Sequence, residues 1–160
     1  MPKSSDAQSR DELIWRIVAA IGLVFLLLGL LDIALTWFPL DLGDSEWELG
    51  TTSHFFDTFP LLGLGISFLL AASIAEGRRW QARTIATFCV LLAVFMWLAL
   101  ALWVTVLPVA LKVIGNSPAL TVIKKASAKT AVEALLYPFA LLWLAGAAWR
   151  ASLRKRMGGY

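Results

Sequence analysis

Long runs of apolar residues constrain this chain more than any other feature of its sequence. Four such runs, separated by polar breaks, cover residues 14–37, 59–75, 84–111 and 132–149. A helix of about 20 apolar residues crosses the hydrocarbon core of a bilayer, and it satisfies its own backbone hydrogen bonds there. The runs do not alternate apolar and polar residues as the strands of a membrane barrel do. The sequence therefore predicts four membrane-spanning helices.

The composition agrees with this prediction. Hydrophobic residues make up 59% of the chain and charged residues 16%, whereas soluble domains have about 45–50% and 25%. A water-soluble fold of this size exposes too much surface to hide so many apolar side chains. We therefore expect one all-α integral membrane domain over residues 1–160, a four-transmembrane-helix bundle. Its extracytoplasmic loops are expected at 38–58 and 112–131.

The distribution of positive charge predicts the orientation of the bundle. Ten of the 14 Lys and Arg residues lie in the two tails, in the first turn of the first run or between the second and third runs, and the other four lie in 112–131. Cytoplasmic connections carry an excess of Lys and Arg. We expect a multi-pass protein of the bacterial inner (plasma) membrane with both termini in the cytoplasm.

Residue types and motifs exclude many kinds of active site. The chain has one cysteine, Cys89, and one histidine, His54, which excludes a disulfide framework and Cys- or His-cluster metal sites. It has no nucleophile motif and no phosphate-binding loop. We expect no enzymatic activity, no cofactor and no nucleic-acid partner. The basic clusters are interpreted as contacts with anionic lipid head groups.

Two carboxylates fall within the apolar runs, Asp32 in the first and Glu133 near the outer end of the fourth. An ionisable group inside a membrane is expensive and is often functional. One interpretation is a proton or cation relay, or a ligand contact. The favoured interpretation is a carboxylate that bonds to polar groups of a neighbouring helix and fixes its register. We expect the two carboxylates at similar depth.

The predicted 38–58 loop carries five acidic residues and no basic one. Trp47, Phe55 and Phe56 suggest that this segment lies along the membrane surface. His54 is a candidate ligand for haem or chlorophyll, although a lone histidine beside two phenylalanines is more simply an interfacial residue.

Small residues recur on one face of the second run, at Gly63, Ser67 and Ala71. Such a stripe lets another helix approach closely, and we predict tight packing of the second span there. Ahead of the fourth run, an amphipathic helical lead-in carries Lys124, Lys125 and Lys129. Together with Trp47, these lysines are candidates for contact with lipid head groups or an acidic partner surface. They are also candidates for pairing with the acidic 38–58 loop.

One pattern spans the junction of the first two runs. It consists of an aspartate near the end of the first run, a tryptophan in the following loop, and an acid shortly before Pro-Leu-x-Gly: Asp32, Trp47, Asp57, Pro60, Leu61 and Gly63. This pattern resembles small four-span bacterial membrane proteins of the HpsJ-like group, whose name comes from cyanobacterial hormogonium polysaccharide biosynthesis. The resemblance implies an association with envelope polysaccharide production and no defined catalytic chemistry.

We therefore predict an accessory or scaffold subunit of a larger membrane assembly, in contact with membrane lipids and with other membrane subunits or further copies of itself. Two alternatives stay open. The first is a pigment- or haem-binding subunit of an energy-converting complex, with His54 as the ligand. The second is a small transporter that uses Asp32.

Overall fold

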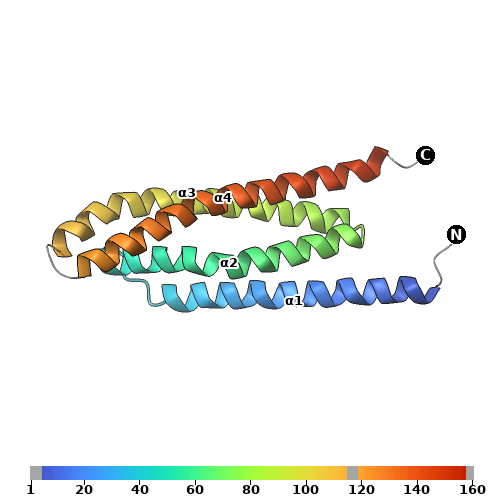
Figure 1. The fold of residues 1–160 in the computed structure, drawn as a ribbon, viewed down its shortest axis with the longest axis horizontal. Helices are drawn as coiled ribbons and strands as arrows, with labels where there is room; N and C mark the ends of the chain where they lie inside the picture. The colour runs from blue at the N-terminus through green and yellow to red at the C-terminus, as the bar shows by residue number, and fades with distance from the viewer. Residues whose placement is uncertain (1–4, 115–118, 158–160) are drawn as a thin grey trace.

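The computed structural model describes residues 5–114 and 119–157, which form four α-helices (Figure 1). These are α1 (Ser5–Trp37), α2 (Ser45–Ala75), α3 (Arg79–Ile114) and α4 (Ala119–Met157). The predicted all-helical bundle is thereby confirmed. Each helix contains a stretch that is long and apolar enough to cross a membrane, which is consistent with a multi-pass membrane protein.

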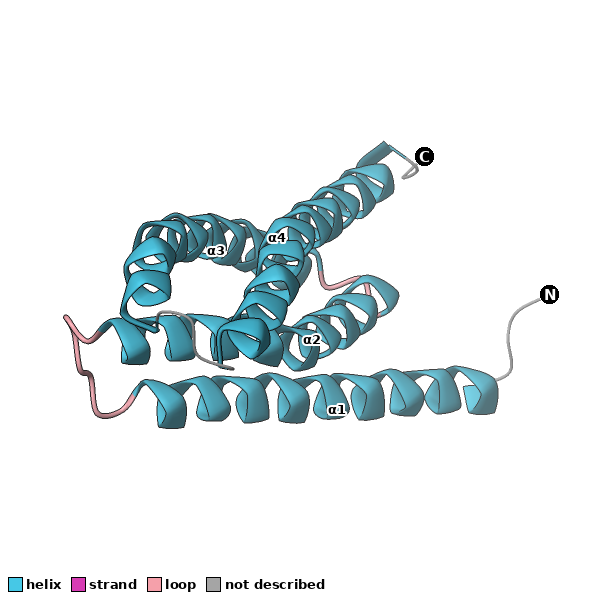
Figure 2. Ribbon diagram, turned by 60° about the vertical axis from the view of Figure 1, so that its left-hand side comes forward, coloured by secondary structure: helices cyan, strands magenta, loops and turns pink. Residues whose placement is uncertain are grey.

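Helix α2 is the centre of the bundle and packs against each of the other three helices. Helices α3 and α4 also pack against each other, whereas the backbone of α1 approaches only that of α2. Figure 2 shows α1 beneath α2 and apart from α3 and α4. Toward α3, α1 extends side chains such as Trp37, whose ring centroid lies 6.3 Å from that of Phe95.

The core lies between α2, α3 and α4. Large side chains come mainly from α2, and small ones line the facing surfaces of α3 and α4. On α3 the buried positions recur every three or four residues, which is the spacing of one helix face: Ala82, Ala86, Cys89, Ala93 and Met96. The alanines allow phenylalanines of α2, such as Phe56 and Phe59, to fill the space between the helices.

Glycines bring α1 and α2 into backbone contact. A Cβ atom added at Gly65 of α2 would lie 2.7 Å from the Leu26 nitrogen and 2.8 Å from the Gly22 carbonyl oxygen of α1. A Cβ atom at Gly22 would lie 2.9 Å from the Gly65 oxygen, and one at Gly29 would lie 2.6 Å from the Leu62 side chain. At Gly22 and Gly65 only glycine permits this separation, because a Cβ atom there would meet backbone atoms of the other helix and push the helices apart.

The close-packed positions differ from the predicted stripe. At Gly63 an added Cβ atom would meet only Phe59 of the same helix, at 3.5 Å. Ser67 is half-buried and donates its hydroxyl to the Gly63 carbonyl, and Ala71 is exposed. Among the described residues, the close backbone contact of α2 therefore forms at Gly65 and not at Gly63.

The structure also corrects the predicted 38–58 loop. From Ser45 onward this segment belongs to α2, and Phe55 and Phe56 are buried in the core and do not lie along a surface. Its polar residues are compatible with a helix because their hydroxyls bond within it, as Thr51 does to the Trp47 carbonyl. Likewise, the helical lead-in predicted within 112–131 is continuous with α4 from Ala119, while residues 115–118 lie outside the described part.

A tight turn joins α2 to α3. Gly77 has a φ of +72°, a left-handed conformation that suits glycine. The Arg78 amide donates to the Ser73 carbonyl and the Gly77 amide to the Ile74 carbonyl, as in a Schellman motif. These bonds end α2 and start α3 only four residues after Ala75.

Alanine substitutions at Gly65 and Gly63 form a matched pair that tests the close contact. Gly65→Ala should destabilise the protein by about 1–3 kcal/mol, because the methyl group has only backbone atoms to displace. Gly63→Ala should be neutral or slightly stabilising, since alanine has the higher helix propensity. Reversible unfolding in mixed micelles, followed by circular dichroism, measures both. Equal stability of the two variants would contradict the helix contact described here.

Candidate functional site

Three polar side chains of α2 occupy adjacent turns near the end of the bundle that holds the α1–α2 connection. His54 and Thr58 are four residues apart and share the face toward α1, while Asp57 reaches α4. Residues four apart lie one above the other on a helix. Helix α2 thus contributes to two polar clusters at the same height in the bundle, one facing α1 and one facing α4.

The first cluster holds Asp32 of α1. Its Oδ2 atom accepts a hydrogen bond of 2.6 Å from the Thr58 hydroxyl and lies 3.0 Å from His54 Nε2. Thr58 is buried, whereas the side chains of Asp32 and His54 are 47% and 39% exposed. Hydrogen bonds to an ionised carboxylate are stronger than neutral ones, so this cluster lowers the cost of placing Asp32 in an apolar helix. It confirms the favoured interpretation that Asp32 bonds to polar groups of a neighbouring helix.

The second cluster joins α2 to α4. Lys129 Nζ lies 2.5 Å from Asp57 Oδ1 and 3.7 Å from Glu133 Oε1. The predicted pairing between the lead-in lysines and the acidic 38–58 segment is therefore confirmed for Lys129. Beside it, the Tyr137 ring stacks on Phe59, with centroids 4.4 Å apart. Since Lys129 bridges carboxylates of two helices, it ties the start of α4 to α2.

The two carboxylates predicted at similar depth belong to different clusters. Asp32 is bound on the α1 side of α2, and Glu133 takes part in the Lys129 cluster of α4. The Glu133 side chain is 16% exposed, and its Oε2 atom has no hydrogen-bond partner among the described residues. The structure therefore shows no carboxylate pair formed by these two residues within the described part of the chain.

The other candidate residues have simpler environments. Lys124 and Lys125 are exposed on α4, and Trp47 is half-buried in the first turn of α2. If His54 bound the metal of a haem or chlorophyll through Nε2, it would have to give up its contact with Asp32 Oδ2. Among the residues that the structure describes, no group of three His, Cys, Asp or Glu side chains is placed to hold a metal ion.

Sequence reasoning missed the glycines that carry the closest helix contact. Gly22 and Gly29 lie seven residues apart, or two helical turns, in the most apolar run of the chain. That spacing places both on one face. This spacing was a signal that the sequence alone offered for α1. Gly65 has no second glycine at the same spacing in α2, so its contact with α1 could be found only in the structure.

No protein-family model matches the chain, and no curated protein or solved structure is significantly similar to it.

A double-mutant cycle tests whether the Asp32 cluster fastens α1 to α2. Asp32→Ala and Thr58→Val should each destabilise the protein, with a coupling free energy of about 1 kcal/mol, because they remove the same hydrogen bond. Unfolding in mixed micelles gives the four stabilities. Thr87→Val is the matched control, since the Thr87 hydroxyl bonds only to the Arg83 carbonyl of its own helix. Strict additivity of Asp32→Ala with Thr58→Val would refute the link.

Proposed function

We propose that this chain is a non-enzymatic multi-pass protein of a bacterial inner membrane that serves as an accessory or scaffold subunit of a larger membrane assembly. The observation that carries the proposal is the isolation of α1, whose backbone approaches only α2. In the most apolar stretch of α1, 11% of the residues are buried, against 44% for α2. A helix held on one side only offers the rest of its surface to lipid or to another membrane protein.

The unused stripe of α2 supports the same proposal. An added Cβ atom at Gly63 would have no atom of another described helix within 4 Å, Ser67 is half-buried and Ala71 is exposed. Small residues on an accessible helix face permit close approach of a second transmembrane helix. The resemblance to HpsJ-like proteins adds envelope polysaccharide production as the process that such an assembly would serve.

Charge supports the proposed orientation, with both termini cytoplasmic. The first residue of α1 and the last of α4 lie at the same end of the bundle as the α2–α3 turn (Figure 1). That turn and the start of α3 carry Arg78, Arg79 and Arg83. The opposite connection, between α1 and α2, carries Asp41 and Asp44 and no basic residue. This asymmetry matches the excess of Lys and Arg on cytoplasmic connections.

Substitutions of the stripe test the scaffold proposal. The wild-type protein, solubilised in a gentle detergent, should migrate as an oligomer or with a co-purifying membrane protein. Gly63→Leu should disperse this assembly and leave the isolated bundle folded, because an added Cβ atom there meets only Phe59 of its own helix and no backbone of a neighbouring helix. Native electrophoresis and light scattering measure assembly, and circular dichroism measures folding.

Gly65→Leu is the control for this experiment, since it collides with the α1 backbone and should unfold the chain. A wild-type protein that runs as a lone monomer in gentle detergent would contradict the scaffold proposal. So would an assembly that Gly63→Leu leaves intact when Ser67→Leu also has no effect.

The contact of His54 with Asp32 favours a second candidate, a small proton-coupled transporter. Two titratable side chains with 3.0 Å between Nε2 and Oδ2 form a pair that can share a proton. In this case Asp32→Asn should abolish proton-coupled flux into proteoliposomes while the protein stays folded and abundant. Unchanged flux in Asp32→Asn would remove the transporter from consideration.

A further inference from the structure

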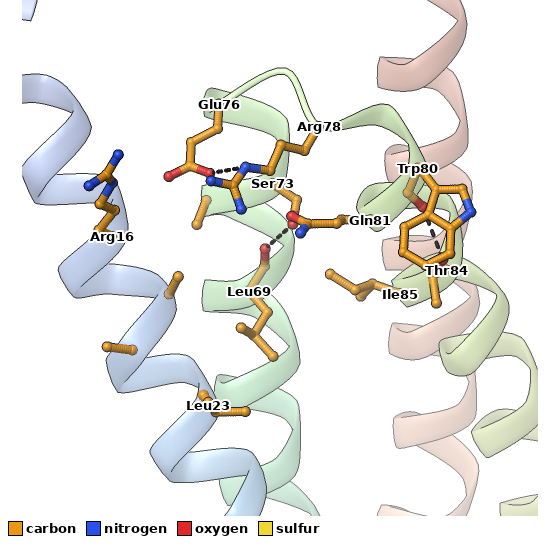
Figure 3. Close-up of a pocket in the computed structure, with 13 residues that line it drawn as sticks. Arg16, Leu23, Leu69, Ser73, Glu76, Arg78, Trp80, Gln81, Thr84 and Ile85 are labelled. Carbon is orange, nitrogen blue, oxygen red and sulfur yellow. Dashed lines mark hydrogen bonds and ion pairs between the residues drawn. The ribbon is translucent and has the colours of Figure 1, made fainter.

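A crevice opens between α1 and α3 at the arginine-bearing end of the bundle, with α2 as its floor (Figure 3). Its volume is about 410 Å³. It exists because the backbone of α1 approaches α2 but not α3, so the two outer helices leave a gap above α2. In a bilayer this gap faces lipid, because α1 and α3 are both candidate spans.

The inner part of the crevice is apolar. Small and branched side chains line it from three helices, including Ala20 and Leu23 of α1, Leu69 of α2 and Ile85 of α3. In a bilayer, apolar walls of this kind hold an acyl chain by close van der Waals packing. They do not favour a small hydrophilic ion.

The mouth of the crevice is charged with both signs. Arg16 projects from α1, and Glu76 and Arg78 come from the turn that follows α2 (Figure 3). Glu76 Oε2 and Arg78 Nε are 2.6 Å apart. The same three residues line an adjoining hollow of about 460 Å³, to which α1 adds Asp11 and Glu12. The mouth therefore combines two guanidinium groups with three carboxylates.

Tryptophans flank the mouth on both sides. Trp15 of α1 lines the adjoining hollow, and Trp80 of α3 lines the crevice with 78% of its surface exposed. Tryptophan is enriched at the level of lipid head groups. The two rings thus place the charged mouth at the head-group level and the apolar walls at the level of the acyl chains.

We propose that the α1–α3 crevice binds one phospholipid whose head group carries a phosphate and a primary ammonium, as phosphatidylethanolamine does. Arg16 and Arg78 bind the phosphate, and the carboxylates of Glu12 and Glu76 receive the ammonium. One acyl chain lies on α2 between α1 and α3. A purely anionic head group would face three carboxylates at the mouth, which is why the charges favour a zwitterionic lipid. The proposal requires the chain to lie in a membrane and does not require a partner protein.

Competition among lipids tests the proposal. The full-length protein is inserted into nanodiscs of phosphatidylethanolamine, phosphatidylglycerol and phosphatidylcholine in equal parts, released into detergent, and examined by native mass spectrometry. The wild type should retain one phosphatidylethanolamine per chain. Arg16→Gln should lower this retention about tenfold, since it removes a charge-assisted contact. Ala20→Phe should abolish it by filling the apolar part.

Each variant has a matched control on the same helix. Arg10→Gln removes an exposed arginine, and Ala34→Phe enlarges an exposed alanine; neither residue lines the crevice or the adjoining hollow. Both controls should retain the lipid as the wild type does, and circular dichroism verifies the fold of all four. If Ala20→Phe fails to fold, Leu23→Trp fills the same walls and replaces it.

Three outcomes would overturn the proposal. These are equal retention in Arg16→Gln and Arg10→Gln, preferential retention of phosphatidylglycerol or phosphatidylcholine, and no retained lipid in the wild type. The result is independent of the scaffold proposal, because Gly63→Leu should disperse the assembly and still retain the lipid.

Discussion

The contact between Gly22 and Gly65 determines how α1 belongs to this fold. Hydrophobic burial does not distinguish a neighbouring helix from lipid tails, so helix association in a membrane depends on close packing and hydrogen bonds. The backbone of α1 approaches that of one other helix, α2, and glycine lets the two backbones approach within the distance that a Cβ atom would occupy. The Asp32 cluster adds a directional bond nearer the α1–α2 connection. Packing sets the separation of the helices, and the cluster sets their register.

Helix α2 organises the polar chemistry as well as the packing. Its face toward α1 supplies Thr58 and His54 to Asp32, while Asp57 supplies a carboxylate to Lys129 of α4. An unpaired charge in an apolar environment is costly, and in both clusters the opposing or hydrogen-bonding group comes from another helix. Polar residues in these helices therefore act as connections that specify which helices are neighbours.

The sequence predicted the helical class and the four apolar stretches because length and hydropathy are local properties. It also predicted a helix-to-helix role for Asp32, since a charge in an apolar run needs a partner. The pairing of Lys129 with the acidic segment followed from placing both on the same side of the membrane. It misplaced the start of the second helix. The polar stretch before Phe55 has the composition of a loop, and only tertiary burial of Phe55 and Phe56 makes it helical. The predicted stripe contained Gly63, whereas the glycine in contact with α1 is Gly65 on another face of α2. Small residues occur around the whole helix, so the sequence did not show which face packs.

The turn at Gly77 has a consequence for how the chain is built into a bilayer. Since only three residues separate α2 from α3, and the Arg78 and Gly77 amides are bonded back to α2, these helices form a closed antiparallel hairpin. Neither one can tilt or slide far without the other. Helix α1 packs against this hairpin through α2, and α4 packs against both of its helices.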